Sequence, residues 1–129
     1  MAGKKVVFVD DSATVLMSVD MACAELVAKG VIELKTYMNP VRFLDDVQSE
    51  KITFDLLVCD VNMPQMNGLD LIGEIKQIPS CRAKLAIALT TESSQDMKEM
   101  GKKVGLNGWL TKPFTDEKIV ASICKILRL

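Results

Sequence analysis

The sequence predicts an α/β fold in which one parallel sheet carries helices on both faces. Short apolar runs, rich in β-branched residues, alternate with longer amphipathic stretches, a pattern typical of repeated strand–helix units. Several runs are apolar at consecutive positions, as expected for strands that are buried on both faces. The length of 129 residues suits one hydrophobic core and not two. We therefore expect residues 1–129 to form a single domain, in which right-handed crossovers produce a three-layer sandwich.

The apolar runs predict five strands. The first, third and fourth runs are apolar throughout, and the fifth is the weakest. In chain order the runs are Val6–Val9, Leu34–Tyr37, Leu56–Cys59, Leu85–Leu89 and Gly108–Thr111.

Five stretches with apolar residues at helical spacing follow these runs and predict five helices. Gly30 is a natural stop for the first helix. Asn39 and Pro40 are suited to open the second, and Thr115 is suited to cap the fifth. The apolar stripes are Leu16, Val19, Cys23, Leu26 and Val27; Phe43, Leu44 and Val47; Leu69, Ile72 and Ile75; Met97, Met100 and Val104; and Ile119, Val120, Ile123, Ile126 and Leu127.

The composition excludes several functions. Lysine and arginine number 16 against 17 acidic residues, so there is no basic field to hold nucleic acid or an acidic membrane. The chain has no histidine, which excludes a Ser-His-Asp triad, a His-ligated zinc site and phosphohistidine chemistry on this chain. Its four cysteines form no C-x-x-C pair, and it carries neither a secretory signal pattern nor an apolar run of roughly 20 residues. We expect reduced thiols, mostly in the core, and a cytoplasmic location.

Polar and charged residues follow four of the predicted strands. Ligands of open parallel sheets bind at the carboxyl ends of the strands, so these residues should meet at one edge. The first strand is followed by Asp10-Asp11, the third by Asp60, the fourth by Thr90-Thr91 and the fifth by Lys112-Pro113.

Such a cluster has a specific chemistry. Three neighbouring carboxylates repel one another and need a cation to stay ionised in a partly buried site. Oxygen ligands with room for water favour Mg²⁺, which could bridge a phosphoryl group to Asp10, Asp11 and Asp60. A carboxylate can act as a nucleophile and form an aspartyl phosphate. Lys112 would pair with the phosphoryl oxygens, and the Thr90 hydroxyl would hydrogen-bond one of them.

Each of these features also has an ordinary structural interpretation. Asp10-Asp11 could cap the following helix, and Asp60 could form a turn. Lys112 could be a solvated loop charge, and Thr90-Thr91 could reflect β-propensity alone. Coincidence on four strand ends is nevertheless improbable.

Four motifs together resemble the receiver domain of bacterial response regulators, over essentially the whole chain. The resemblance implies a flavodoxin-like, doubly wound, five-stranded parallel sheet in the order 2-1-3-4-5 with five helices on both faces, an order that is documented for this family. The length, together with Asn62 two residues after Asp60 and Glu92 two residues after Thr90, is most similar to the stand-alone chemotaxis (CheY) type. The motifs are Val9-Asp10-Asp11-Ser12; the run from Cys59-Asp60-Val61-Asn62 through Met63-Pro64-Gln65-Met66-Asn67-Gly68; Leu89-Thr90-Thr91-Glu92; and Thr111-Lys112-Pro113-Phe114.

The resemblance implies a phosphorylation-dependent switch of a two-component system. Asp60 would accept a phosphoryl group from a phosphohistidine on a sensor histidine kinase. Mg²⁺ would be bound by Asp10, Asp11 and Asp60 and by the backbone carbonyl of Asn62. Asn62 and Glu92 would tune how long the phosphoryl group survives.

The resemblance also implies how the switch is transmitted. Thr90 would move toward the phosphoryl group and Lys112 would pair with it. Trp109, in place of the more usual Tyr or Phe, would change rotamer, and the surface of the fourth helix, fifth strand and fifth helix would bind a downstream partner. The alternative for Trp109 is an aromatic side chain that simply packs on the fourth helix. The stripe residues Met97 and Met100 are expected to belong to the core.

Three other functions fit the sequence less well. A small aspartyl-nucleophile phosphatase needs a second Asp as general acid, whereas Asn62 occupies that position; we therefore expect no enzyme beyond self-phosphorylation and slow dephosphorylation. A flavodoxin-like cofactor binder needs a phosphate-holding loop, and Asp10-Asp11 would repel phosphate. A degenerate docking module would lack a site residue, and none is missing. A receiver that belongs to a larger regulator stays open, and no nucleic-acid or membrane partner is expected.

Overall fold

Five parallel strands form one sheet in the order β2-β1-β3-β4-β5. The structure is a computed structural model, and it describes residues 3–91 and 94–129. The order confirms the doubly wound topology expected from the resemblance. The strands are β1 (Lys4–Val9), β2 (Ile32–Tyr37), β3 (Leu56–Asp60), β4 (Leu85–Thr90) and β5 (Gly108–Thr111).

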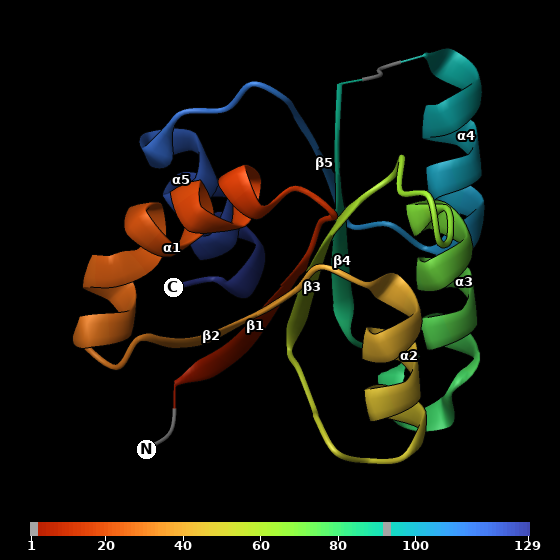
Figure 1. The fold of residues 1–129 in the computed structure, drawn as a ribbon, viewed down its shortest axis with the longest axis horizontal. Helices are drawn as coiled ribbons and strands as arrows, with labels where there is room; N and C mark the ends of the chain where they lie inside the picture. Colours follow the sequence, from red (N-terminus) through yellow and green to blue (C-terminus); the bar gives the residue numbers. More distant parts are fainter. Residues whose placement is uncertain (1–2, 92–93) are drawn as a thin grey trace.

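Helices cover both faces of the sheet, as predicted. In Figure 1, α1 and α5 lie on one side of the sheet, and α2, α3 and α4 lie on the other. The helices are α1 (Ala13–Ala28), α2 (Pro40–Gln48), α3 (Gly68–Gln77), α4 (Gln95–Val104) and α5 (Asp116–Leu127), with a short 3₁₀ turn at Pro79–Cys81. Within the described residues, no helix is both long and apolar enough to cross a bilayer.

The consecutive apolar residues of the central strands are buried on both faces. In β3, Leu56 and Val58 pack into the core beneath α1 and α5, whereas Leu57 and Cys59 pack into the core beneath α2 and α3. Because successive side chains of a strand point to opposite faces, a strand between two helical layers needs an apolar residue at every position. The interpretation of these runs as doubly covered strands is therefore confirmed.

Side-chain caps fix where the helices begin. The Asn39 side chain accepts a hydrogen bond from the N–H of Val41 at 2.9 Å, and the Thr115 hydroxyl accepts one from the N–H of Lys118 at 3.1 Å. Each cap satisfies a backbone donor that has no partner inside its helix. Gly30, with φ +72, follows the end of α1 in the left-handed region. These three expectations are confirmed.

Two apolar stripes are less complete than predicted. Met97 packs against a cluster formed with Val61, Leu69 and Ala88, but Met100 is 50% exposed and Val27 is 41% exposed. Met97 and Val104 share a helical face, whereas Met100 is rotated about 60° from it. The fourth helix therefore contributes Met97 and not Met100 to the core.

The cysteines lie mostly in the core. Cys23, Cys59 and Cys81 are buried and Cys124 is partly exposed, all as free thiols, so the prediction of mostly core thiols is confirmed.

β2 begins at Ile32 rather than at Leu34, where the apolar run begins. As an edge strand it mixes exposed and buried residues, which hides its start from an apolar-run criterion.

Candidate functional site

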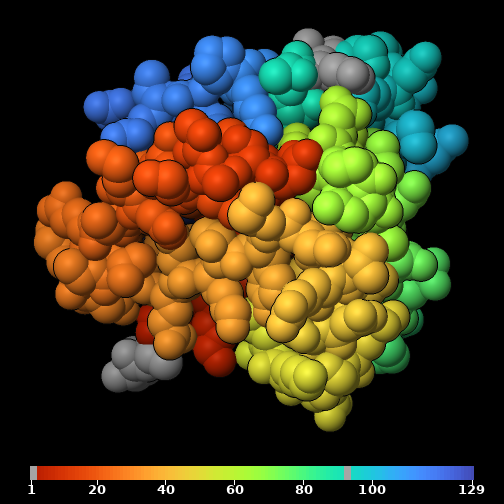
Figure 2. Space-filling model, in the orientation of Figure 1, coloured from red at the N-terminus to blue at the C-terminus, as the bar shows by residue number. Residues whose placement is uncertain are grey.

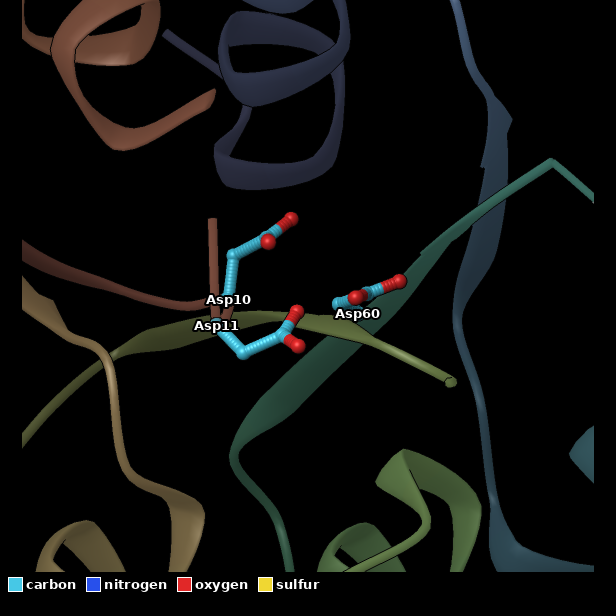
Figure 3. A group of neighbouring side chains, drawn as sticks. All are labelled: Asp10, Asp11 and Asp60. Carbon is cyan, nitrogen blue, oxygen red and sulfur yellow. The ribbon is translucent and has the colours of Figure 1, made fainter. Parts of the chain in front are cut away.

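Carboxylates from two strand ends converge at one edge of the sheet. Asp10 and Asp11 directly follow β1, and Asp60 is the last residue of β3. Figure 3 shows the three carboxyl groups gathered at this edge, and one oxygen from each lies within 4.8 Å of the others. In Figure 2 the start of α1, in red, lies beside the segment that follows β3, in yellow-green.

Asp10 is held from two sides. Its side chain is fully buried; Oδ1 accepts a hydrogen bond from the Ser12 N–H at 2.9 Å, and Oδ2 accepts one from Lys112 Nζ at 2.8 Å. Its own N–H donates to the carbonyl of Tyr37 at 3.0 Å. The cap of α1 is Ser12, whose hydroxyl accepts from Val15 N–H. The interpretation of Asp10-Asp11 as a helix cap is therefore wrong for these residues.

Lys112 is the cation of this edge. Its Nζ lies 2.8 Å from Asp10 Oδ2 and 3.4 Å from Asp60 Oδ1, and its side chain is 17% exposed. Burial would lower the pKa of Lys112, but its hydrogen bond and charge interactions with Asp10, and then those with Asp60, outweigh burial and raise the pKa. Its N–H donates to the Thr90 carbonyl at 2.8 Å, which anchors the residue to the end of β4. Lys112 is thus not a solvated loop charge.

The surroundings of Asp60 disfavour its ionised form. Burial, followed by the negative charge of Asp10, raises its pKa from 3.8 to about 6, although Lys112 opposes the change and Asp11 adds to it. Burial and the charge of Asp10 together therefore outweigh the effect of the Lys112 ammonium group on Asp60. An additional cation would stabilise the ionised form, and the all-oxygen donor set fits Mg²⁺.

The segment after β3 is wound tightly against the backbone of Asp60. The Gly68 N–H donates to the Val61 carbonyl at 2.8 Å, and Asn67 caps α3 through the Leu69 N–H at 2.8 Å. A Cβ on Gly68 would overlap the carbonyl oxygen of Asp60, so only glycine fits this close approach. The tight loop both ends the strand and fixes the position of Asp60.

The remaining predicted residues that the structure describes lie on β4 and β5 or in the segment after β3. Thr90 ends β4 and is fully buried, and Asn62 is exposed in the segment after β3. Trp109 pairs in register with Ala88, and its partly buried ring packs on the α4 side of the sheet with Met97. This conformation agrees with the alternative interpretation of Trp109, in which the ring packs on the fourth helix. Glu92 lies outside the described residues.

Sequence reasoning placed Ser12 and Gly68 in motifs and Tyr37 in a strand, but it did not predict how these residues hold the carboxylates of the site. Ser12 holds Asp10 through its N–H, the Tyr37 carbonyl receives the Asp10 N–H, and Gly68 permits the close loop. Ser12 could have been found as a capping residue ahead of the first helical stripe. The Tyr37 contact comes from backbone pairing of β1 and β2 and has no signal of its own in the sequence.

A partly buried lysine between two strand-end carboxylates, in a five-stranded parallel α/β sheet, is the arrangement that the resemblance to receiver domains implies. A family model for the response regulator receiver domain matches residues 6–124. The chain belongs to this family.

Two named relatives and one solved structure support the same assignment. The chain is 30% identical to the chemotaxis protein CheY1 of Helicobacter pylori over 113 residues, which are 88% of each chain. It is 32% identical to the transcriptional regulatory protein CpxR of Escherichia coli over 124 residues, 96% of this chain but 49% of CpxR. The structure of Vibrio cholerae chemotaxis protein CheY4 matches with a TM-score of 0.85 at 30% identity, covering 97% of this chain and 99% of CheY4.

Family membership defines the general activity. Receiver domains are phospho-accepting signalling domains, and membership of this family supports a two-component phosphorylation switch. In general a receiver domain implies a histidine kinase as donor and a downstream target. Receiver domains bind Mg²⁺ through an acidic pocket, and this chain has a cluster of three carboxylates, Asp10, Asp11 and Asp60, at the same edge of the sheet.

Proposed function

We propose that Asp60 is the phosphoacceptor of this receiver. A carboxylate oxygen of Asp60 attacks the phosphorus of the kinase phosphohistidine, the P–N bond breaks, and the imidazole leaves and takes up a proton. The observation that carries the proposal is the position of Asp60: within 4.8 Å of two other carboxylates and 3.4 Å from Lys112 Nζ. The carboxylates of Asp10 and Asp11, whose charges raise the pKa of Asp60, would bind the cation that stabilises its ionised form.

Asp10, Asp11 and Asp60 would hold Mg²⁺ together with the backbone carbonyl of Asn62. When bound, the ion would neutralise phosphoryl oxygens during in-line transfer. Lys112 already lies between Asp10 and Asp60, so it can donate to a phosphoryl oxygen on Asp60 without leaving the site. The hydroxyl of Thr90, at the end of the neighbouring strand, would donate to another.

The output of the switch is a change at the surface of α4, β5 and α5. Thr90 pairs in register with Thr111 and Ala88 pairs with Trp109, so a movement of Thr90 is transmitted along two paired strands. Trp109 would change rotamer, and a downstream partner would bind the altered surface. Asn62 and Glu92 would set the rate at which the phosphoryl group is lost.

The protein acts as a stand-alone, cytoplasmic regulator of the chemotaxis type, formed by a single domain over residues 1–129, with neither nucleic acid nor membrane as partner. The support is its match to CheY1 over 88% of both chains. The second candidate is a receiver that forms part of a larger regulator, and the match to about half of CpxR favours it.

Intact-mass measurement after incubation with acetyl phosphate and Mg²⁺ tests the phosphoacceptor. We expect one phosphoryl group on the wild-type chain, none on Asp60→Asn, and none in EDTA. Asp20→Asn, which removes an exposed carboxylate on α1, is the matched control and should be phosphorylated normally. A phosphoryl adduct that persists in Asp60→Asn would overturn the proposal.

A further inference from the structure

The edge strand β2 has an open outer side. It is paired with β1 on its inner side, and the described part of the chain supplies no strand on its outer side. In Figure 2 the segment that contains β2, in orange, lies at the surface between α1 and α2. The strand is six residues long and pairs with β1 at every position, without a bulge. A regular, open edge of this kind can pair with another strand.

The outward-facing backbone groups of β2 belong to alternate residues. The Tyr37 carbonyl points toward β1, because it accepts the N–H of Asp10 at 3.0 Å. Successive residues of a strand turn their N–H and carbonyl groups to opposite sides. The residues whose backbone groups point away from β1 are therefore Ile32, Leu34 and Thr36.

Two opposite charges lie beside this edge, on one face of the strand. Glu33 and Lys35 are exposed, and they share the α2 face with Tyr37, which packs into the core beneath that helix. Both line a groove of about 490 Å³ between β2 and the segment 50–53. Neither forms an ion pair within the described residues. Lys35 Nζ instead lies 5.8 Å from the centroid of the Tyr37 ring.

Antiparallel pairing of two copies about Leu34 satisfies both the backbone and the charges. In this register Leu34 lies opposite Leu34 of the second copy, and Ile32 lies opposite Thr36, so the outward-facing groups hydrogen-bond one another. Glu33 of each copy then lies opposite Lys35 of the other, at the non-hydrogen-bonded positions where side chains are closest. A register centred on Glu33 or on Lys35 would instead oppose like charges.

The charge pattern selects a second copy over an unrelated strand. Charged residues at a sheet edge usually prevent pairing, because most strands do not compensate them. The order Glu33-Leu34-Lys35 is an exception, since it is complementary to itself when the second strand runs in the opposite direction. The strand therefore repels partners of other charge patterns and accepts its own.

We propose that two copies of this chain associate through their β2 edges, antiparallel about Leu34, and form one continuous sheet across a two-fold axis. One six-residue strand from each copy forms a contact smaller than the stable interfaces of about 1,200–2,000 Å². The dimer is therefore weak, with a Kd of about 0.1–1 mM.

The dimer is independent of the proposed function. Because the two β2 strands run in opposite directions and each is parallel to its own β1 and β3, the edges that carry Asp60 lie at opposite ends of the dimer. β5 is at the far end of each sheet, so the surface of α4, β5 and α5 stays free in both copies. Phosphorylation and dimerisation should therefore not exclude each other.

Sedimentation equilibrium between about 10 µM and 1 mM tests the charge pairing. The wild type should dimerise reversibly. Glu33→Lys and Lys35→Glu each place like charges opposite one another and should raise the Kd at least about fivefold. The double variant that carries both changes exchanges the signs and should recover the wild-type Kd. Glu74→Lys, the same charge change at an exposed position of α3, is the matched control and should dimerise normally.

Three results would overturn the inference. They are a wild type that stays monomeric at 1 mM, equal Kd values for Glu33→Lys and Glu74→Lys, and a double variant that is as weak as the single ones. An equimolar mixture of Glu33→Lys and Lys35→Glu gives a further check, because each chain complements the other. The mixture should dimerise more tightly than either variant alone, and the absence of this gain would contradict the register.

Amide hydrogen exchange, read in ¹H–¹⁵N spectra, tests the backbone pairing. The N–H groups of Ile32, Leu34 and Thr36 should exchange about two- to fivefold more slowly at about 1 mM than at about 50 µM. Those of Glu33 and Lys35, which face β1, should not respond to concentration. Outward-facing amides that stay unprotected would refute pairing at β2. Intact mass after acetyl phosphate is read on the same samples, so a chain that is phosphorylated but monomeric refutes this inference alone.

Discussion

Removal of the Asp60 charge should stabilise the metal-free protein. Asp60 is 6% exposed and its carboxyl group lies beside that of buried Asp10. The free energy of unfolding of Asp60→Asn, relative to wild type in EDTA, should therefore depend on pH. The substitution keeps the size of the side chain and removes only its ionisation, which isolates the electrostatic effect.

The pKa of Asp60 gives the magnitude and the sign. Burial and Asp10 raise this pKa from 3.8 to about 6. Between these two values the native state holds a proton that the unfolded state has lost, so the wild type loses stability as pH rises through this window and no further above it. The loss corresponds to at most about 3 kcal/mol. The advantage of Asp60→Asn over wild type should therefore grow by about 2–3 kcal/mol between pH 4 and pH 7.

Urea denaturation at several pH values measures this difference directly. In EDTA, the two unfolding free energies should diverge as pH rises, and Asp20→Asn should track the wild type. Saturating Mg²⁺ should reverse the order at pH 7, because the ion binds the ionised cluster of the native wild type. A difference between Asp60→Asn and wild type that does not change with pH would refute the reasoning.

Three further outcomes are expected. Lys112→Met should destabilise the metal-free protein by about 3–5 kcal/mol, because Asp10 stays buried without its cation. In urea denaturation, Mg²⁺ should restore part of the lost stability. An unfolding midpoint equal to that of the wild type would contradict the ion pair. Gly68→Ala should lower the free energy of unfolding by about 1–3 kcal/mol, because its Cβ would overlap the backbone carbonyl of Asp60. In the control Gly73→Ala the nearest neighbour of the Cβ is at 3.5 Å, so this variant should be neutral or more stable by up to about 1 kcal/mol. Equal thermal shifts of the two variants would count against the close approach of Gly68 to Asp60. Iodoacetamide should label Cys124, which is partly exposed, before the three buried thiols, as peptide mass mapping can check.

Much of the fold followed from elementary patterns, and the reasons are physical. The consecutive apolar residues of β3 could only be satisfied by two covering layers, and caps such as Asn39 and Thr115 had the side chains that their positions demand. The strand order could not be predicted from such patterns. It depends on which crossovers run across which face, and only the resemblance to receiver domains supplied it.

The site was predictable as far as side-chain chemistry and strand ends determine it. Asp10, Asp11 and Asp60 are brought together because parallel strands end at one edge. The supports of the site depend on the backbone and on shape: the Ser12 N–H that holds Asp10 and the space that Gly68 leaves for Asp60 become visible only in three dimensions.

Trp109 marks the limit of sequence reasoning. Its position three residues before Lys112 was informative only through the resemblance, and the sequence left open both a switch and simple packing on the fourth helix. The ring packs on the α4 side, and its unpaired N–H within the described residues depends on which way the indole points, which no sequence pattern encodes.

The most direct test of the central proposal is chemical location of the phosphoryl group. After incubation with acetyl phosphate and Mg²⁺, borohydride reduction of an aspartyl phosphate converts the modified residue to homoserine, and peptide mass spectrometry identifies its position. We predict modification at Asp60 and at neither Asp10 nor Asp11. Modification at Asp10 or Asp11, or none at all while acetyl phosphate and Mg²⁺ are present, would contradict the proposal.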